Sequence, residues 1–231
     1  MRMLIDSDII LYKVGFAVEN ESKFLVKTTL DKYINSLIKD SGCTSYQHYL
    51  TGKDNFRNTV SNTYKANRKD TPKPKHYAHI RKLLIRDWKA EVIDGMECDD
   101  ALGLNQTDKT FIATIDKDLL MVSGLHFNMN SREFTTITDE EGDRFFYKQM
   151  LMGDNVDNIK AIKGIGTKTA DKLLDAIDRS EWDAMIMSKY EEHFKDQEGK
   201  HWYQRFVENT QLLWILNKRE MPIGIRGSYH G

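Results

Sequence analysis

The chain has 231 residues, of which 40% are hydrophobic and 10% aromatic, so it can bury a sizeable core and is neither disordered nor of low complexity. Charged residues make up 30% of the chain, and no uninterrupted apolar run approaches the length of a membrane span. Cys43 and Cys98 give no disulfide framework, and the opening MRMLID is typical of a strand, not of a signal peptide. We therefore expect a protein of the reducing cytoplasm that has no membrane partner.

The net charge of −1 conceals one strongly basic segment. Residues 53–89 hold eleven Lys or Arg against three Asp, a net charge of +8, whereas the rest of the chain sums to −9. A local excess of this size favours a polyanion such as nucleic acid over the alternative of a solvated charged helix.

Strands and helices are predicted to alternate over the first 150 residues. The predicted strands are 1–5, 46–50, 90–93, 110–115, 125–129, 133–138 and 144–148. The predicted helices are 9–18, 30–39, 77–88, one from about Asp99, 117–122, 168–177, 181–194 and 201–217. A long polar segment occupies 52–75, and the tail 221–231 is expected to be extended. This order predicts an α/β domain with a parallel sheet over 1–152 and a smaller helical unit over 153–231.

Acidic side chains follow three of the predicted strands. They are Asp6 and Asp8, then Glu97, Asp99 and Asp100, then Asp116 and Asp118. Parallel strands deliver such groups to one edge of the sheet, where their mutual repulsion is relieved by Mg²⁺ or Mn²⁺. An Asp after a strand is by itself also typical of a helix N-cap. The prediction therefore rests on the three clusters together and on a fourth pair, Asp154 and Asp157. Two such ions clamp a phosphodiester for hydrolysis.

A glycine turn lies in the segment IKAIKGIGTKTADKLL, residues 159–174. Gly164 and Gly166 allow positive φ and close approach of a backbone, and the amides of the following helix favour an anion. The segment lacks the spacing of a Walker A loop, so ATP binding is not predicted. It instead favours a helix–hairpin–helix that holds a nucleic-acid backbone without reading its sequence.

These motifs together resemble the 5′→3′ exonuclease and flap endonuclease family, which includes the N-terminal domain of DNA polymerase I. The most specific stretch is GDNVDNI at 153–159 followed by GIGTKTA at 164–170, with Ala161 in place of one family glycine. YKANR at 64–68 matches the family's YKxxR motif, and ECDD at 97–100 and DKD at 116–118 match its middle acidic motifs. The resemblance covers residues 1 to about 178, and the length is most similar to free-standing bacteriophage enzymes. It implies a PIN-like 5′ nuclease core.

The resemblance implies a role for each matching residue. Asp6, Glu97 and Asp99, with Asp100 beside them, would hold a first Mg²⁺, and Asp116, Asp118, Asp154 and Asp157 would serve a second. Lys65 and Arg68 would act as catalytic cations on the scissile phosphate, and Tyr64 would stack on a base. The remaining nucleic-acid contacts would be Arg57, Lys69, Gly164, Gly166, Lys168 and Thr169. In this family the helix–hairpin–helix often binds K⁺, and residues 53–75 correspond to an arch, which is short here.

One departure from the family concerns an aspartate that usually follows the second strand. The aligned position falls near Gly52, and Asp54 lies only two residues before the aromatic–arginine pair Phe56–Arg57. Either Asp54 serves as the ligand or this carboxylate is missing. Asp8 has no implied role, and Cys98 is expected to pack with its thiol directed away from the ions.

The expected function is a metal-dependent 5′→3′ exonuclease with flap endonuclease activity. The expected partners are DNA with a 5′ end, a flap or a nick, and RNA–DNA hybrids at primers, and the chain is taken as a monomer. A phage-encoded enzyme would act in the host cytoplasm. Two alternatives stay open at this point, a PIN-type ribonuclease and a non-catalytic DNA-binding relative.

Overall fold

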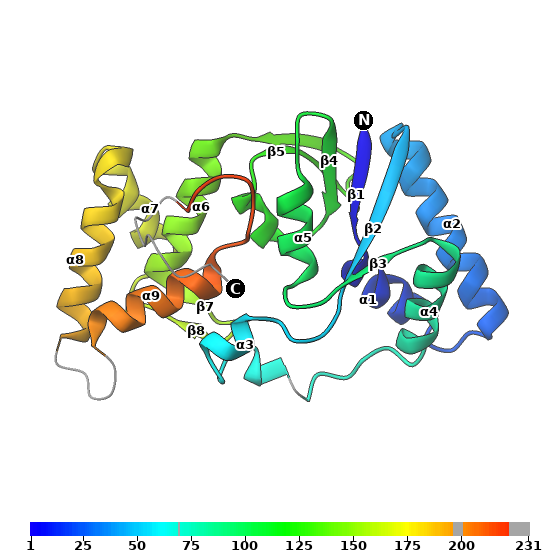
Figure 1. Ribbon diagram of the computed structural model, residues 1–231, viewed down its shortest axis with the longest axis horizontal. Helices are drawn as coiled ribbons and strands as arrows, with labels where there is room; N and C mark the ends of the chain where they lie inside the picture. The colour runs from blue at the N-terminus through cyan, green and yellow to red at the C-terminus, as the bar shows by residue number, and fades with distance from the viewer. Residues whose placement is uncertain (69, 196–200, 222–231) are drawn as a thin grey trace. The chain divides into compact units, whose positions relative to one another are not determined.

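The computed structural model describes residues 1–68, 70–195 and 201–221 (Figure 1). The chain forms two compact units by the density of its internal contacts. Unit 1 comprises Met1–Asn55, Thr71–Asp139 and Ile215–Lys218. Unit 2 comprises the described residues of Phe56–Asp70, Glu140–Trp214 and Arg219–Gly231. The expected boundary between a nuclease core over 1–152 and a DNA-binding unit over 153–231 stays a prediction.

Unit 1 is built on a six-stranded sheet with the order β3-β2-β1-β4-β5-β6. All neighbours pair in parallel except β5 with β6. The strands are β1 (Arg2–Asp6), β2 (Ser45–Thr51), β3 (Glu91–Ile93), β4 (Thr110–Thr114), β5 (Gly124–Asn128) and β6 (Phe134–Ile137). The central strand β4 is buried along its whole length, as strands covered on both faces must be. The predicted α/β class with a parallel sheet is confirmed.

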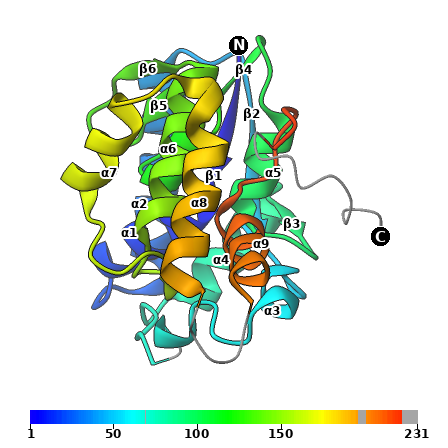
Figure 2. The ribbon, with the colours of Figure 1, turned by 90° about the vertical axis from the view of Figure 1, so that its left-hand side faces the viewer.

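The helices of unit 1 cover both faces of this sheet because the chain adds strands first on one side of β1 and then on the other. α1 (Ser7–Ala17), α2 (Lys23–Ser41) and α4 (Tyr77–Asp87) connect strands that step from β1 outward to β3, and they pack against one another. α5 (Cys98–Asn105) carries the chain back across to β4 and packs on β1 and β2. Figure 2 shows α1 and α2 on one side of β1 and α5 on the other. A reversal between β1 and β4 is the place where ligands bind in open α/β sheets, at the carboxyl ends of the strands.

A neutral histidine is enclosed in the core beneath α1. His48 on β2 is fully buried, its Nδ1 lies 2.8 Å from the Ser7 hydroxyl, and its ring meets Trp88 edge-on. Burial lowers the pKa of His48 to about 3, because the interior disfavours the charged ring.

This burial makes stability depend on pH in a defined direction. As pH falls below about 6.5 the unfolded chain protonates His48 while the folded chain does not, so the free energy of unfolding should fall by up to about 1.4 kcal/mol per pH unit. His48→Gln should have a shallower dependence between pH 6.5 and 4, measured by urea unfolding at several pH values. Equal slopes for the two proteins would contradict this assignment.

Unit 2 is mainly helical. Its elements are α3 (Arg57–Val60), a 3₁₀ turn (Ala66–Arg68), α6 (Asp139–Met152), β7 (Gly153–Asp154), β8 (Ile159–Lys160), α7 (Thr167–Asp175), a 3₁₀ turn (Arg179–Glu181), α8 (Trp182–Phe194) and α9 (Trp202–Leu213). The predicted strand at 144–148 is wrong, because α6 runs through it. Phe146 and Met150, and likewise Tyr147 and Leu151, are buried at a spacing of four, which is the period of a helix. The predicted tail lies almost entirely outside the described residues. No helix in the described part of the chain has the length and apolar character to cross a membrane.

Candidate active-site residues in the two units

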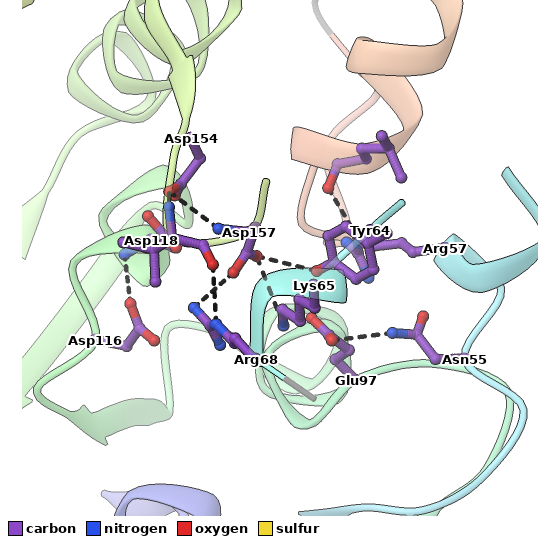
Figure 3. A network of polar contacts seen from close by, with 12 residues as sticks. Asn55, Arg57, Tyr64, Lys65, Arg68, Glu97, Asp116, Asp118, Asp154 and Asp157 are labelled. Carbon is purple, nitrogen blue, oxygen red and sulfur yellow. Dashed lines mark hydrogen bonds and ion pairs between the residues drawn. The ribbon is translucent and has the colours of Figure 1, made fainter. Parts of the chain in front are cut away.

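Hydrogen bonds link the first and third acidic clusters of unit 1. Asp6 ends β1 and caps α1, where its Oδ1 accepts from the backbone N–H of Ile9 at 3.2 Å. Its Oδ2 accepts from the hydroxyl of Thr114 at 2.8 Å, at the end of the neighbouring strand. Thr114 Oγ1 in turn accepts from the backbone N–H of Asp116 at 2.9 Å. Asp116 Oδ1 accepts from the N–H of Asp118 at 2.9 Å (Figure 3). The ends of β1 and β4 therefore bring Asp6 and Asp116 close together at the reversal of the sheet.

The environment of Asp6 opposes its negative charge. Burial, and then the nearby charge of Asp8, raises the pKa of Asp6 to about 7, against a smaller lowering by Thr114 and Ile9. Asp116 raises it further. A cation beside Asp6 would remove this penalty, so the group is poised to bind one.

Asp8 joins this cluster, although the sequence suggested no role for it. Its Oδ2 accepts from the backbone N–H of Thr51 at 3.2 Å, which fixes it at the carboxyl end of β2. Burial raises the pKa of Asp8, and Glu97 adds to the effect, whereas Thr51 and Arg81 lower it. The signal that could have revealed Asp8 is its place in the first turn of a helix that follows a parallel strand.

Cys98 does pack in the interior, but its thiol faces the cluster and is not directed away from it. Its Sγ donates to the carbonyl of Tyr49 at 3.3 Å and lies 3.9 Å from Asp6 Oδ1. One potential ligand atom from each of Asp6, Cys98 and Asp99 lies within 4.8 Å of the others. Burial and the neighbouring carboxylates keep the pKa of the Cys98 thiol well above its usual value. The thiol thus stays protonated, and the oxygen atoms are the donors that suit a hard cation.

The second acidic cluster surrounds the start of α5, and its members differ in what they already bind. Asp100 is fully buried and accepts from the backbone N–H groups of Glu97 at 3.0 Å and Leu216 at 2.9 Å. This arrangement caps the helix and leaves metal binding by Asp100 a prediction. Glu97 is partly exposed, and its Oε1 accepts from the side chain of Asn55 at 2.9 Å.

The segment after β2 has no space for the aspartate that the family usually places there. A Cβ atom at Gly52 would lie 2.1 Å from Asp94 Oδ1 and 2.6 Å from the carbonyl oxygen of Ile93. Asp54 is exposed and has a left-handed backbone, with φ of 59°. Metal binding by Asp54 stays a prediction, and it is the neighbouring Asn55 that contacts Glu97.

In unit 2 the fourth acidic pair sits in a tight turn. Asp154 is buried, and its Oδ1 accepts from the backbone N–H of Val156 at 2.7 Å. Gly153 begins this turn with φ of 74°, and a Cβ atom there would lie 2.2 Å from the carbonyl oxygen of Ile159. Only glycine fits this position, because both the dihedral angle and the space exclude a side chain.

The YKANR segment lies against the same turn (Figure 3). Asp157 accepts from the hydroxyl of Tyr64 at 3.1 Å and forms ion pairs with Lys65 at 3.6 Å and Arg68 at 2.6 Å. The two predicted catalytic cations are thus held by one predicted metal ligand. Tyr64 is only 6% exposed, so stacking on a base would need its ring to be uncovered.

Arg57 has a different environment from the other basic residues of its segment. It is 2% exposed, and its guanidinium donates to the carbonyls of Leu212 at 3.0 Å and Trp214 at 2.7 Å, near the end of α9. These bonds tie α3 to α9 inside unit 2, and contact of Arg57 with nucleic acid stays a prediction.

The glycine turn presents its predicted nucleic-acid contacts to solvent. Gly164, Gly166, Lys168 and Thr169 are all exposed, and Gly164 has φ of 88°. Beside them lies a cavity of about 410 Å³ lined by the turn, by His193 and Phe194 of α8 and by Arg205 of α9. Lys69, predicted to contact nucleic acid, lies outside the described residues.

Curated proteins similar to this chain include two 5′-3′ exonucleases. A 5′-3′ exonuclease of Buchnera aphidicola is 32% identical over 143 residues, which are 54% of this chain and 50% of that protein. A 5′-3′ exonuclease of Bacillus subtilis is 27% identical over 216 residues, covering 77% of this chain and 71% of that protein. The chain thus spans about half the length of the first of these relatives. No family model matches the sequence.

The fold matches a solved phage nuclease. The bacteriophage T5 5′-exonuclease with bound zinc superposes with a TM-score of 0.62 at 18% identity, covering 92% of this chain and 86% of that one. The chain thus shares the fold of this phage enzyme, and its sequence is similar to curated 5′-3′ exonucleases.

Proposed function

We propose that this protein is a metal-dependent 5′→3′ exonuclease and flap endonuclease that hydrolyses phosphodiester bonds at the 5′ ends of duplex or branched DNA. The observation that carries the proposal is the series of hydrogen bonds that links Asp6 through Thr114 to Asp116 and Asp118 at the reversal of the sheet. The similarity to two 5′-3′ exonucleases supports it.

The donor set of unit 1 fits a hard divalent cation. The oxygen atoms of Asp6, Glu97 and Asp99 would hold Mg²⁺, for which Mn²⁺ could substitute, and the buried charge of Asp6 favours such an ion. The T5 enzyme was solved with bound zinc and, as a flap endonuclease, with DNA and metal ions. When bound, the ions would supply Lewis-acid activation of the phosphate and of water. We extend the proposal to a second ion that involves Asp116 and Asp118, and to K⁺ at the glycine turn. Metal binding by Asp154 stays a prediction.

The remaining residues would hold DNA. Lys65 and Arg68 would place positive charge against the phosphate that is cut. The exposed amides around Gly164 and Gly166, with Lys168 and Thr169, would hold the duplex backbone in the manner of a helix–hairpin–helix. Cys43 and Cys98 are both unbridged, which supports action in a reducing cytoplasm.

The test is cleavage of a 5′-end-labelled flap DNA with Mg²⁺, with and without EDTA, beside a single-stranded RNA of the same sequence. We expect short 5′ products from the flap that disappear with EDTA. Preferential cleavage of the RNA would instead support a PIN-type ribonuclease. Tight binding of the flap with no cleavage in Mg²⁺ or Mn²⁺ would support a non-catalytic DNA-binding protein.

Affinity for duplex DNA should fall steeply with salt. Each phosphate contact by Lys or Arg releases counterions, so with about five contacts the log–log slope should be about −4 to −5. Fluorescence anisotropy in 50 to 300 mM KCl, with Ca²⁺ in place of Mg²⁺ to prevent cleavage, measures this slope. An affinity that does not change with salt concentration would show that the basic segment does not contact DNA.

A further inference from the structure

The segment 63–68 of unit 2 is bound along the turn at 154–158 by a set of contacts that involves both backbones. The backbone N–H of Lys65 donates to the carbonyl of Asp157 at 2.9 Å. The side chain of Asn67 donates to the carbonyl of Asn155 at 3.0 Å. In the other direction, the side chain of Asn158 donates to the carbonyl of Thr63 at 2.8 Å. These bonds fix the register of the two segments without using any charge.

Asp157 adds the charged part of this contact (Figure 3). Its Oδ1 lies 2.6 Å from the guanidinium of Arg68, and its Oδ2 lies 3.1 Å from the Tyr64 hydroxyl and 3.6 Å from Lys65 Nζ. Arg68 also donates from Nε to the carbonyl of Val156 at 3.0 Å. The side chain of Asp157 is 12% exposed, against 28% for Lys65 and 43% for Arg68, so the carboxylate is the enclosed partner.

These contacts already use both oxygens of the carboxylate. Oδ2 accepts a hydrogen bond from Tyr64, whereas Lys65 and Arg68 contact the carboxylate as ion pairs. A metal ion bound directly by Asp157 would compete with these two cations for the same negative charge. The neighbouring Asp154 differs, because its Oδ1 accepts from backbone amides of its own turn.

From this geometry we infer that Asp157 is a positioning residue that holds Lys65 and Arg68 for the phosphate, and not a metal ligand. The inference deepens the proposed function, on which it rests. Long basic side chains lose rotamer freedom when they are fixed, and the ion pairs with Asp157 fix Lys65 and Arg68 before DNA binds. Both cations keep exposed surface while paired with Asp157, so a phosphate can still reach them.

The test compares Asp157→Asn with Asp116→Asn, which removes an equal charge from the proposed metal site. Mn²⁺ binding, followed by electron paramagnetic resonance, should be within about twofold of wild type in Asp157→Asn and at least about tenfold weaker in Asp116→Asn. In flap cleavage Asp157→Asn should lower kcat by about 10- to 100-fold with little change in KM, because misplaced cations act on the transition state. Loss of Mn²⁺ affinity equal to that of Asp116→Asn would overturn the inference.

A second comparison separates positioning from general structural damage. In a Lys65→Ala/Arg68→Ala background, Asp157→Asn should have almost no further effect on kcat, since nothing remains for it to position. If Asp157→Asn lowers kcat in that background by as much as it does in the wild-type protein, the inference is overturned.

Hydrogen exchange gives a readout that does not depend on activity. Peptides covering 63–68 should exchange about tenfold faster in Asp157→Asn than in wild type and be unchanged in Asp116→Asn. Should wild type fail to cleave, the proposed function fails while exchange still tests the hold of Asp157 on this segment. If the exchange of residues 63–68 is the same in Asp157→Asn as in wild type, Asp157 does not fix this segment.

Discussion

Asp6→Asn should abolish Mg²⁺-dependent flap cleavage, by about three orders of magnitude or more. Asparagine can still cap α1, as Asp6 does through the Ile9 amide, so the helix should keep its start. What is lost is the buried charge beside Asp116 and Thr114 that would hold the cation. Single-turnover cleavage of the labelled flap measures the effect, with the exposed Asp108→Asn as a control that keeps wild-type activity.

The same variant should have the opposite effect on stability. The pKa of Asp6 is raised from 3.8 to about 7 in the folded protein, so the folded state binds a proton more tightly than the unfolded chain. The resulting stabilisation is complete below about pH 4 and is lost as pH rises toward 7. Without metal, Asp6→Asn should therefore gain stability over wild type across this range, by roughly 1.4 kcal/mol per pH unit at most. A constant difference from pH 4 to 8 would mean that the fold does not oppose this charge.

Lys65→Ala should reduce turnover far more than DNA binding. Lys65 is one of several cations near the proposed phosphate path, so its loss should weaken binding of uncleaved duplex by less than about threefold. Its charge should matter most where charge develops in the transition state, and we expect kcat to fall about 100-fold, or about 2.7 kcal/mol.

Single-turnover kinetics and fluorescence anisotropy measure the two effects separately. The exposed Lys109→Ala, outside the basic segment, is the matched control and should change neither. Equal losses in turnover and affinity would show that Lys65 only anchors a phosphate.

The sequence predicted the sheet and its acidic edge because both depend on local patterns. Buried apolar runs mark β1 and β4, and an acidic residue after each run is enough to place Asp6 and Asp116 at one edge once the strands are parallel. The same local reasoning failed at 144–148, where FFY looks like a strand in a short window. The buried pairs Phe146–Met150 and Tyr147–Leu151 show the helical period only over a longer one.

The contacts that the sequence could not predict are those between distant segments. No local pattern shows that Asp157 faces Lys65 and Arg68, some 90 residues away, or that the charge of Arg57 is satisfied by carbonyls at the end of α9. Nor does composition show that Asp94 fills the space beside Gly52. Such features depend on how the chain packs, and motif matching assigns these residues to ligands or to DNA because it cannot see their partners.

The most direct measurement is a crystal structure of the protein soaked in Mn²⁺, with an anomalous difference map. We predict a peak bound by the carboxylate of Asp6, with Asp99 or Asp116 contributing oxygen ligands, and with Asp157 still paired to Arg68. The absence of any peak beside Asp6 at millimolar Mn²⁺, in crystals where other sites are occupied, would contradict a metal-dependent nuclease built on this edge of the sheet.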